Sequence, residues 1–466
     1  MKMLIFILIQ AVNKMNTLLE GDKRFFYRRI LTVTVPVVIQ NMLNIGLNLA
    51  DTIMIGRLGE LELAATGAAN QLFGIFLSVC FGFYSGTSVF VAQYYGVKDI
   101  KSIRKLIGFD IALGTIIGLA FLSIAQLKAE SIIYIFAKDE TVISYGSSYL
   151  RIVSLSYILM AIAFAISYNS RVVARMKVPT IINASAMLIN IVLNYVLIYG
   201  VGAFPHLGVA GAAYATLTAR SLELVALVIY VTIDKTHPFH AAFKELFVKD
   251  FCLYKKVVKT GLPVVFSESG WSIGLTLVFA TYGIIGPSAL AVIQVASLTS
   301  MIFQSVIFGF GNGASVVIGE TLGIGKFELA KLYANKTIKI ASIMIACMVA
   351  GIIVMIRPIS AIYNFSPETT ELLGKVLIVF AFTLIPRMLS YIFQCGILRA
   401  GGDTLFCMVI ELTSNLVIEL AMAHTAVVFL KWPLQMCIAL ASLGNIFKMS
   451  AFIIRYKSGK WQKKVI

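Results

Sequence analysis

Two carboxylates lie inside stretches of the sequence that are otherwise apolar enough to cross a lipid bilayer. Asp51 follows amides at Asn41, Asn44 and Asn48, and this spacing of three or four residues places all four on one helical face. Glu268 lies about eleven residues into a later apolar stretch. A charged acid at mid-bilayer costs on the order of 3 kcal/mol. Each acid must therefore face a partner, a cavity or a proton.

Asp51 is the candidate for reversible ion binding. Asn190 and Asn194 are four residues apart on a later apolar stretch and share one helical face. Amide oxygens suit Na⁺ and can also hydrogen-bond to a protonated acid. We therefore expect Asp51, Asn48, Asn190 and Asn194 to form an ion-coupling site, with Na⁺ held by Asp51, Asn190 and Asn194 if Na⁺ is the ion. The alternative is an interfacial acid near Arg57.

A second cavity is expected in the second part of the chain, lined by Glu268, Trp271, Glu419 and Arg387. Trp271 can offer an aromatic face to an organic cation, although core packing is the alternative. Glu268 can equally serve as a structural hydrogen-bonding group between helices. Glu419 lies deep in its stretch and can pair with Arg387. Glu411, eight residues earlier, is expected near the inner surface as a solvated acid.

The other charged residues within apolar stretches are expected to pair. Arg220 and Glu223 are three residues apart and can pair on one helix. Asp110 follows a basic loop and is expected to pair with Lys105 or a neighbour. The six cysteines (80, 252, 347, 395, 407 and 437) lack metal-ligand spacing and are interpreted as core residues. We expect no cofactor beyond a coupling ion, H⁺ or Na⁺.

Composition indicates a membrane protein that crosses the bilayer many times. The 466 residues are 59% hydrophobic and only 13% charged. The apolar pattern predicts an all-α integral membrane protein with twelve transmembrane helices. The predicted spans are 29–55, 63–94, 103–126, 147–172, 178–200, 208–233, 257–283, 287–320, 334–357, 371–397, 404–427 and 432–455. Residues 127–146 and 358–370 are expected to be outer segments.

The sequence repeats itself with a constant shift of 227 residues. Proline and glycine landmarks keep this register over about sixty residues, which chance similarity between apolar helices does not produce. Six spans per repeat give both halves the same orientation, so their pseudo-twofold axis is expected along the membrane normal. The matched positions are Pro36 with Pro263, Gly59 with Gly286, Phe81 with Phe308, Gly82 with Gly309, Gly86 with Gly313 and Gly96 with Gly323.

The repeat divides the chain into five parts: a tail (1–28), a six-helix half (29–233), a linker (234–256), a second six-helix half (257–455) and a basic tail (456–466). With an inside N-terminus, 29 Lys and Arg residues lie on the inner side and 7 outside. This bias predicts that both termini are cytoplasmic. It also explains the net charge of +17 through anionic inner-leaflet lipid rather than nucleic acid. The apolar run within 1–14 is too short to span; a signal peptide, a translation-start artefact and a peripheral tail remain open.

Several stretches together resemble the multidrug and toxic compound extrusion (MATE) family of transporters. LADTIMIGRLGELELAATG, containing Asp51, is similar to the end of the family's first helix, and 189–200 and 207–220 resemble its fifth and sixth. LPVVFSESGWSIG (262–274) resembles the seventh helix, and ILRAGGDT (397–404) matches the loop after the tenth. Three departures stand out: Asn194 replaces an acid of some relatives, NSRVVARMKVP (169–179) lacks paired glycines, and Glu419 replaces an uncharged residue.

The resemblance implies a bacterial inner-membrane antiporter that expels organic cations or other amphipathic small molecules, using a gradient of H⁺ or Na⁺. The partners implied are the lipid bilayer and the substrate, with a monomer as the working unit. One alternative is a lipid-linked saccharide flippase of the same superfamily. Such a flippase is expected to line its cavity with several basic residues, and within spans only Arg220 and Arg387 are candidates. An intramembrane enzyme is disfavoured because the four histidines form no cluster.

Overall fold

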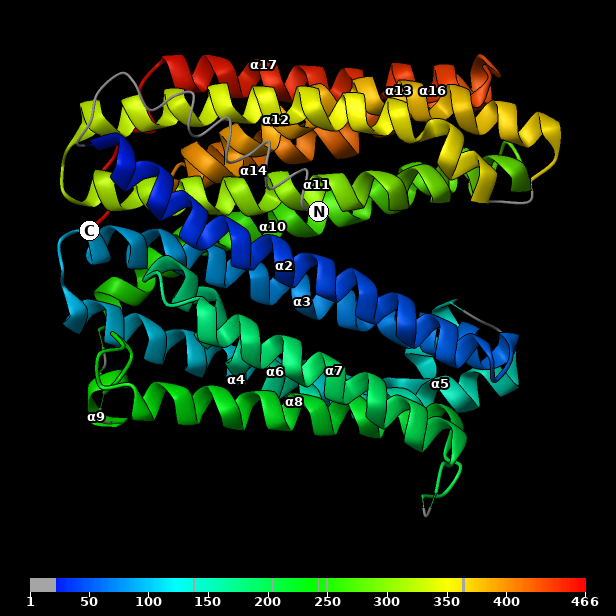
Figure 1. The fold of residues 1–466 in the computed structure, drawn as a ribbon, viewed down its shortest axis with the longest axis horizontal. Helices are drawn as coiled ribbons and strands as arrows, with labels where there is room; N and C mark the ends of the chain where they lie inside the picture. Colours follow the sequence, from blue (N-terminus) through cyan, green and yellow to red (C-terminus); the bar gives the residue numbers. More distant parts are fainter. Residues whose placement is uncertain (1–21, 137–138, 203, 242, 249, 363–364) are drawn as a thin grey trace.

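The computed structural model describes residues 22–466, apart from 137–138, 203, 242, 249 and 363–364. The described residues form helices long and apolar enough for the twelve predicted spans, one of which is a bent pair of helices (Figure 1). The expectations for residues 1–14 lie outside the described residues.

The first half contains six spans. The long helices extend beyond the predicted ends, and the fourth span begins at 140 rather than 147, with a bend of 49° between its two helices. The segment expected to be an outer element is therefore mostly helical. The helices are α2 (Asp22–Gly56), α3 (Glu60–Gly96), α4 (Ile100–Phe136), α5 (Glu140–Val153) with α6 (Ser156–Val172), α7 (Lys177–Tyr199) and α8 (Gly208–Ile233).

The second half repeats this order after the short helix α9 (Phe243–Leu246). Its last three spans are interrupted by π-helical or irregular turns. The elements are α10 (Phe251–Gly283), α11 (Pro287–Gly323), α12 (Phe327–Ile362), α13 (Pro367–Tyr391) with η1 (Ile392–Leu398) and η2 (Arg399–Gly401), α14 (Thr404–Leu412) with η3 (Thr413–Glu419), α15 (Leu420–His424) and η4 (Thr425–Phe429), and α16 (Leu434–Ala441) with α17 (Leu443–Lys457).

Glycines bring the two halves into contact through matched pairs of positions. A Cβ atom at Gly86 would collide with Gly261, and one at Gly313 would collide with Thr34. Adding 227 to 34 and 86 gives 261 and 313, so these contacts are one pair of sites exchanged between halves, as a twofold axis requires. The same exchange relates Gly82–Val265 to Gly309–Val38 and Gly96–Glu320 to Gly323–Gln93. Because α3 and α11 meet at their carboxyl ends, the pseudo-twofold axis runs along the helix bundle.

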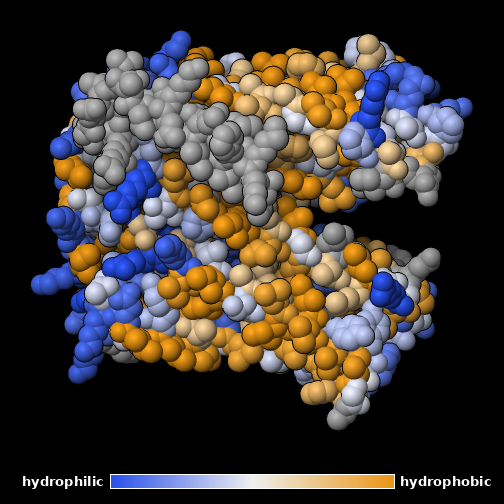
Figure 2. Space-filling model, in the orientation of Figure 1, coloured by the Kyte–Doolittle hydropathy of each residue, from blue (hydrophilic) through white to orange (hydrophobic). Residues whose placement is uncertain are grey.

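The halves separate toward the opposite end of the bundle. At Gly46 and Gly74, nearer the other ends of α2 and α3, an added Cβ atom would meet nothing within 4 Å. Figure 2 shows the resulting hollow between the halves, on the right of the view. The closed end carries the last described residues of the chain (Figure 1). The molecule is therefore a pair of helical halves that touch at one end and open at the other.

Candidate functional site

The polar stripe on α2 divides between two cavities. Asn41 and Asn44 line a cavity between the halves, which we call the central cavity. Asn48 and Asp51 line a separate cavity inside the first half, which we call the first-half cavity. The two groups share a helical face, but Asn41 and Asp51 are ten residues apart, or about 15 Å along the axis. One helix therefore presents side chains to both cavities.

The first-half cavity has a volume of about 420 Å³ and is lined by residues of one half alone. Its walls come from α2, α3, α5, α6, α7 and α8. Amides and hydroxyls dominate its polar lining, with one carboxylate and one guanidinium. The polar members are Asn48, Asp51, Thr52, Thr66, Asn70, Tyr149, Ser156, Asn190, Asn194, Thr216 and Arg220.

Asp51 lies beside the two amides that the sequence placed near it. Asn194 Nδ2 donates a 2.6 Å hydrogen bond to Asp51 Oδ1, and also reaches Asn190 Oδ1 at 3.3 Å. Asn194 Oδ1 is buried without a hydrogen-bond partner among the described residues. Asp51 forms no ion pair with any described residue, and neither Arg57 nor Arg220 pairs with it. A carboxylate and an unpartnered amide oxygen are suitable ligands for Na⁺, and the carboxylate alone suits a proton.

The polar wall contributed by α7 is continuous. Asn190 Nδ2 lies 3.4 Å from Thr216 Oγ1 on α8, which places a hydroxyl in the same network. Asn48 lines the cavity but is exposed, and no side-chain hydrogen bond joins it to Asp51 in the described structure. Its part in ion binding stays a prediction.

The central cavity has a volume of about 300 Å³ and is lined by both halves. Predicted residues Glu268, Trp271 and Arg387 line it, together with aromatic rings at Phe81 and Phe308. Its remaining polar and charged members are Gln40, Asn41, Asn44, Arg171, Ser267, Asn312, Tyr391, Gln394, Glu411 and Lys448. The basic lining differs from the sequence expectation: Arg220 belongs to the first-half cavity, whereas Arg171 and Lys448 accompany Arg387 here.

Glu268 is held by an arginine that the sequence analysis did not single out. Arg399 Nη1 lies 2.7 Å from Glu268 Oε1, and Arg399 Nη2 lies 3.4 Å from Ser267 Oγ. Arg399 is buried, with only 4% of its side chain exposed. Arg399 lies in the stretch ILRAGGDT, at the end of the tenth span, where basic residues are common at a membrane surface. Its place in that stretch was the sequence feature that could have identified it as a site residue.

Two expectations for the eleventh span are wrong. Glu411 is buried rather than solvated: Lys448 Nζ on α17 lies 3.0 Å from Glu411 Oε1, and Asn415 Nδ2 donates to the same oxygen at 2.7 Å. Glu419 forms no ion pair with Arg387 among the described residues, and its closest donor is Asn445 Nδ2 at 3.4 Å. Glu419 does not line the central cavity. The π-helical segment η3 follows Glu411 and ends at Glu419, and its wider turn changes the direction of Glu419 relative to that of Glu411.

Two other charged residues, Arg220 and Asp110, form contacts within the first half. Arg220 Nη1 lies 2.7 Å from Glu223 Oε2, so the predicted pair is confirmed. Asp110 does not pair with Lys105, which instead contacts Asp250 at 3.1 Å. Asp110 is fully buried and accepts hydrogen bonds from Thr87 at 2.7 Å and Asn169 at 2.8 Å. It lines neither cavity.

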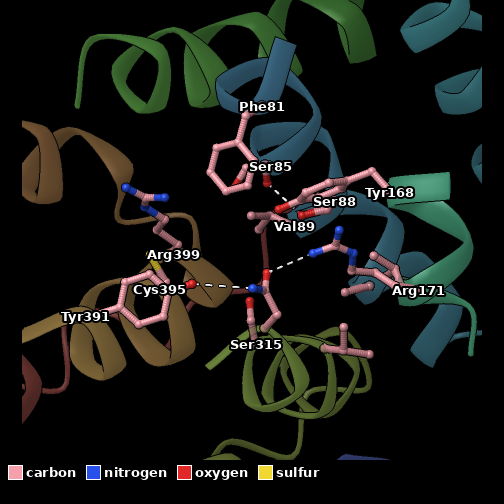
Figure 3. A pocket seen from close by; sticks show the side chains of 14 residues that line it. Phe81, Ser85, Ser88, Val89, Tyr168, Arg171, Ser315, Tyr391, Cys395 and Arg399 are labelled. Carbon is pink, nitrogen blue, oxygen red and sulfur yellow. Dashed lines mark hydrogen bonds between the residues drawn. The ribbon is translucent and has the colours of Figure 1, made fainter. Parts of the chain in front are cut away.

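Side chains from both halves meet below the central cavity, toward the closed end. Figure 3 shows Arg171 reaching from α6, across from Tyr391 and Arg399 of the second half. Arg171 Nη1 donates to Asn312 Oδ1 at 3.3 Å, and Asn312 Nδ2 lies 3.4 Å from the Tyr391 hydroxyl. These contacts form the floor of the central cavity.

At the closed end, an ion pair between described residues and the last residues of the chain hold the two halves together. Arg29 pairs with Glu320 across the halves and also donates to the Val172 carbonyl at 3.3 Å. Gln93 occupies the position equivalent to Glu320 in the repeat, and its Oε1 accepts a 2.8 Å hydrogen bond from the Val465 amide. Symmetry-related positions thus seal the closed end by different chemistry.

Similarity to known protein sequences identifies the family. The family described as MatE matches residues 36–196 and 263–425. These two matches begin 227 residues apart, at Pro36 and Pro263, in the register of the internal repeat. The chain belongs to this family of multidrug and toxic compound extrusion (MATE) transporters and is a multi-pass membrane protein.

Relatives and solved structures agree with this assignment. The chain is 24% identical to the uncharacterized transporter YisQ of Bacillus subtilis (89% of this chain, 90% of the relative). It is 25% identical to the probable multidrug resistance protein NorM of Thermotoga maritima (94% of each). A structure of a multidrug resistance MATE family transporter in an outward-facing conformation has the same fold, with a TM-score of 0.83 at 20% identity (93% of this chain, 96% of that chain).

Proposed function

We propose that this protein is an antiporter that expels organic cations or other amphipathic organic compounds in exchange for H⁺ or Na⁺. The observation that carries the proposal is the 2.6 Å hydrogen bond that Asn194 Nδ2 donates to Asp51 Oδ1, beside the Asn194 Oδ1 atom, which has no partner among the described residues. These groups line the first-half cavity, and α2 lines both this cavity and the central cavity. Several relatives, including that of Thermotoga maritima, are named as probable multidrug resistance proteins.

The proposed location is the bacterial inner membrane, with both termini cytoplasmic and a single chain as the transporting unit. The excess of Lys and Arg at the closed end supports this orientation. The open end of the central cavity then faces the outside. One chain contains both halves of the bundle, so no second copy is required to complete the cavity.

Transport in this proposal occurs by rocking of the two halves against each other around the central cavity. The contacts of α3 and α11 seal one end of the central cavity, and the same two helices leave its other end open. Rocking exchanges the sealed and open ends, and the linker 234–256 keeps the halves together. This is alternating access in the form typical of transporters with internal repeats.

Coupling in this proposal rests on Asp51. An antiporter must avoid crossing the membrane with both substrate and driving ion bound. Binding of H⁺ or Na⁺ at Asp51 must therefore weaken substrate binding, and linkage makes the effect reciprocal. A coupling free energy of about 1–3 kcal/mol corresponds to roughly 5–150-fold in each affinity.

The test is efflux of an amphipathic fluorescent compound from proteoliposomes containing the full chain, under an imposed gradient of H⁺ or of Na⁺. Wild-type protein should accumulate the compound against its gradient with one of the two ions. Asp51→Asn should fold and bind the compound but lose uphill transport. Glu371→Gln, an exposed acid paired with Lys375, is the matched control. Uphill transport by Asp51→Asn at the wild-type rate would contradict the assignment and make Glu268→Gln the next variant.

A further inference from the structure

The central cavity has more positive than negative charge in its lining. Arg171, Arg387 and Lys448 face two carboxylates, Glu268 and Glu411. Both carboxylates already have a cationic partner: Lys448 lies 3.0 Å from Glu411, and Arg399 lies 2.7 Å from Glu268. A cationic substrate entering the cavity therefore finds no carboxylate without an ion pair among the described lining residues.

Two guanidinium groups of the same cavity have no such partner. Within the described residues, no ion pair includes Arg171 or Arg387. Arg387 also makes no side-chain hydrogen bond there; the charge of Glu419 acts on Arg387, but the two groups form no ion pair or hydrogen bond. When Arg399 and Glu419 are counted as well, four positive side chains (Arg171, Arg387, Arg399 and Lys448) face three carboxylates (Glu268, Glu411 and Glu419), which leaves one excess positive charge around the cavity.

Arg171 is the more constrained of the two. It is 8% exposed, and its only hydrogen bond in the described structure is the 3.3 Å contact with the amide of Asn312. Its Nε is buried without a partner. The guanidinium also lies 4.1 Å from the centre of the Tyr168 ring. Burial of a charge is costly unless a counter-charge compensates it. The cavity thus contains a fixed donor with unused hydrogen-bonding capacity.

The remaining lining suits the apolar part of a small organic molecule. Phe81, Phe164, Trp271 and Phe308 supply aromatic surface from both halves. A cavity of about 300 Å³ accommodates one or two fused rings with a charged substituent. The arginines supply planar donors that match the geometry of a carboxylate or sulfonate.

We propose that the central cavity selects amphipathic organic anions, with the carboxylate or sulfonate on Arg171 and Arg387 and the ring system against the aromatic wall. This inference rests on the proposed function, since it names the substrate class of the same cavity. It places the anionic part of the substrate near the floor and leaves the ion at Asp51 in the other cavity.

The test compares two probes with the same ring and opposite charge, naphthalene-2-sulfonate and 2-naphthyltrimethylammonium. Their binding to the full chain in lipid nanodiscs is measured by titration calorimetry. The sulfonate should bind at least about tenfold tighter, as expected for a charged hydrogen bond. Arg171→Gln and Arg387→Gln should each weaken sulfonate binding by about tenfold without weakening trimethylammonium binding.

Arg151→Gln is the control, because Arg151 is an exposed arginine outside both cavities that pairs with Glu130. It should leave both affinities unchanged. Tighter binding of trimethylammonium by wild type would overturn the inference, as would an unchanged ratio of affinities in both cavity variants. If Arg171→Gln fails to fold, the wild-type ratio and Arg387→Gln still decide the question.

A transport assay distinguishes failure of this inference from failure of the proposed function. Ion-driven efflux of the trimethylammonium probe alone would retain the antiporter and overturn anion selectivity. Sulfonate binding at Arg171 without ion-driven efflux of either probe would retain the selectivity and overturn the antiporter. Ion-driven efflux of the sulfonate, lost in Arg171→Gln, would support both.

Discussion

The two cavities differ in how their carboxylates are compensated. In the first-half cavity, Asp51 receives one amide hydrogen bond and has no ion-pair partner in the described structure. In the central cavity, Glu268 and Glu411 are each held by a cation within 3.0 Å. A carboxylate without a counter-charge can bind H⁺ or Na⁺. A carboxylate that is already paired with a cation binds either ion less readily, because the cation stabilises its charged form. The difference separates a candidate ion site from a candidate substrate site.

The cavities also differ in which parts of the molecule form them. All residues lining the first-half cavity belong to 47–220, so relative movement of the halves leaves its walls together. The central cavity is lined by both halves and must change shape when they move. The polar stripe of α2 reaches both cavities and is the direct physical connection between them.

The largest expected effect is a loss of stability when an ion pair of the central cavity is broken. Lys448→Met removes the counter-charge of Glu411 and should destabilise the protein by about 3–5 kcal/mol, because a buried charge loses its partner. Asp51→Asn should change stability by less than about 1 kcal/mol, because no partner is left unpaired. Melting temperatures in one detergent would measure both.

The double variant Lys448→Met/Glu411→Gln is the control for this comparison. It removes both charges and should recover most of the lost stability. Equal melting temperatures for Lys448→Met and wild type would mean that the ion pair contributes little. The central cavity would then resemble the first-half cavity in this respect.

Sequence patterns predicted the spans and the repeat, which follow from apolar length and from spacing along regular α-helices. The approach of Asp51 to Asn194 is a contact between helices, and it was suggested by the polar type of the two residues within apolar stretches rather than by spacing. The partners of Glu268 and Glu411 could not be predicted, because they depend on how deeply one helix is set against another. Neither could the orientation of Glu419, since the π-helical segment η3 changes the helical phase after Glu411.

The second prediction concerns access to the central cavity from its closed end. Glu320→Gln removes the partner of Arg29 and should destabilise the seal by on the order of 2 kcal/mol. Labelling of Cys395, which lines the central cavity, by an impermeant thiol reagent from the inner side should then rise by about 30-fold. Cys252 and Cys347 are exposed, so their interpretation as core residues was wrong, and both are replaced by serine for this experiment.

A cysteine replacing Asn70 in the first-half cavity is the matched reporter. Its labelling should not change in Glu320→Gln, because that cavity lies within one half. A parallel rise at both cysteines would indicate general loosening of the protein. It would remove the structural distinction between the cavities.

The third prediction distinguishes H⁺ from Na⁺ at Asp51. Asn194→Ala removes a donor that stabilises the charged carboxylate, and with it an amide oxygen able to bind a metal ion. For a proton-coupled protein, efflux should become half-maximal at about tenfold lower proton concentration. For a sodium-coupled protein, about tenfold more Na⁺ should be required.

Asn445→Ala is the matched control, because Asn445 hydrogen-bonds to Glu419 in the second half and lines neither cavity. It should leave both concentration dependences unchanged. If Asn194→Ala changes neither the H⁺ nor the Na⁺ concentration required for half-maximal efflux, Asp51 is not the ion-coupling residue. The proposed role of the first-half cavity would then be wrong.

The smallest expected effect is a change with pH in how tightly the linker 234–256 packs. The linker lies outside both cavities, so this change must be distinguished from binding of a proton at Asp51. Burial lowers the pKa of His237 to about 4, from an ordinary value of 6.5. Its Nδ1 accepts a hydrogen bond from the Phe239 amide at 3.1 Å. A detached linker binds a proton near pH 6.5, whereas the packed linker does so only near pH 4. Packing is therefore fully stabilised above pH 6.5 and weakens as the pH falls, by about 1 kcal/mol between pH 7 and pH 5.5.

Limited proteolysis of the linker measures this effect. Cleavage should be about five- to tenfold faster at pH 5.5 than at pH 7 in the wild-type protein, after correction for protease activity. His237→Asn keeps a hydrogen-bond acceptor but does not titrate, so its cleavage rate should not depend on pH in this range. If transport at low pH changes in wild type and not in His237→Asn, the change comes from the linker. If it persists in His237→Asn and disappears in Asp51→Asn, the proton acts in the first-half cavity.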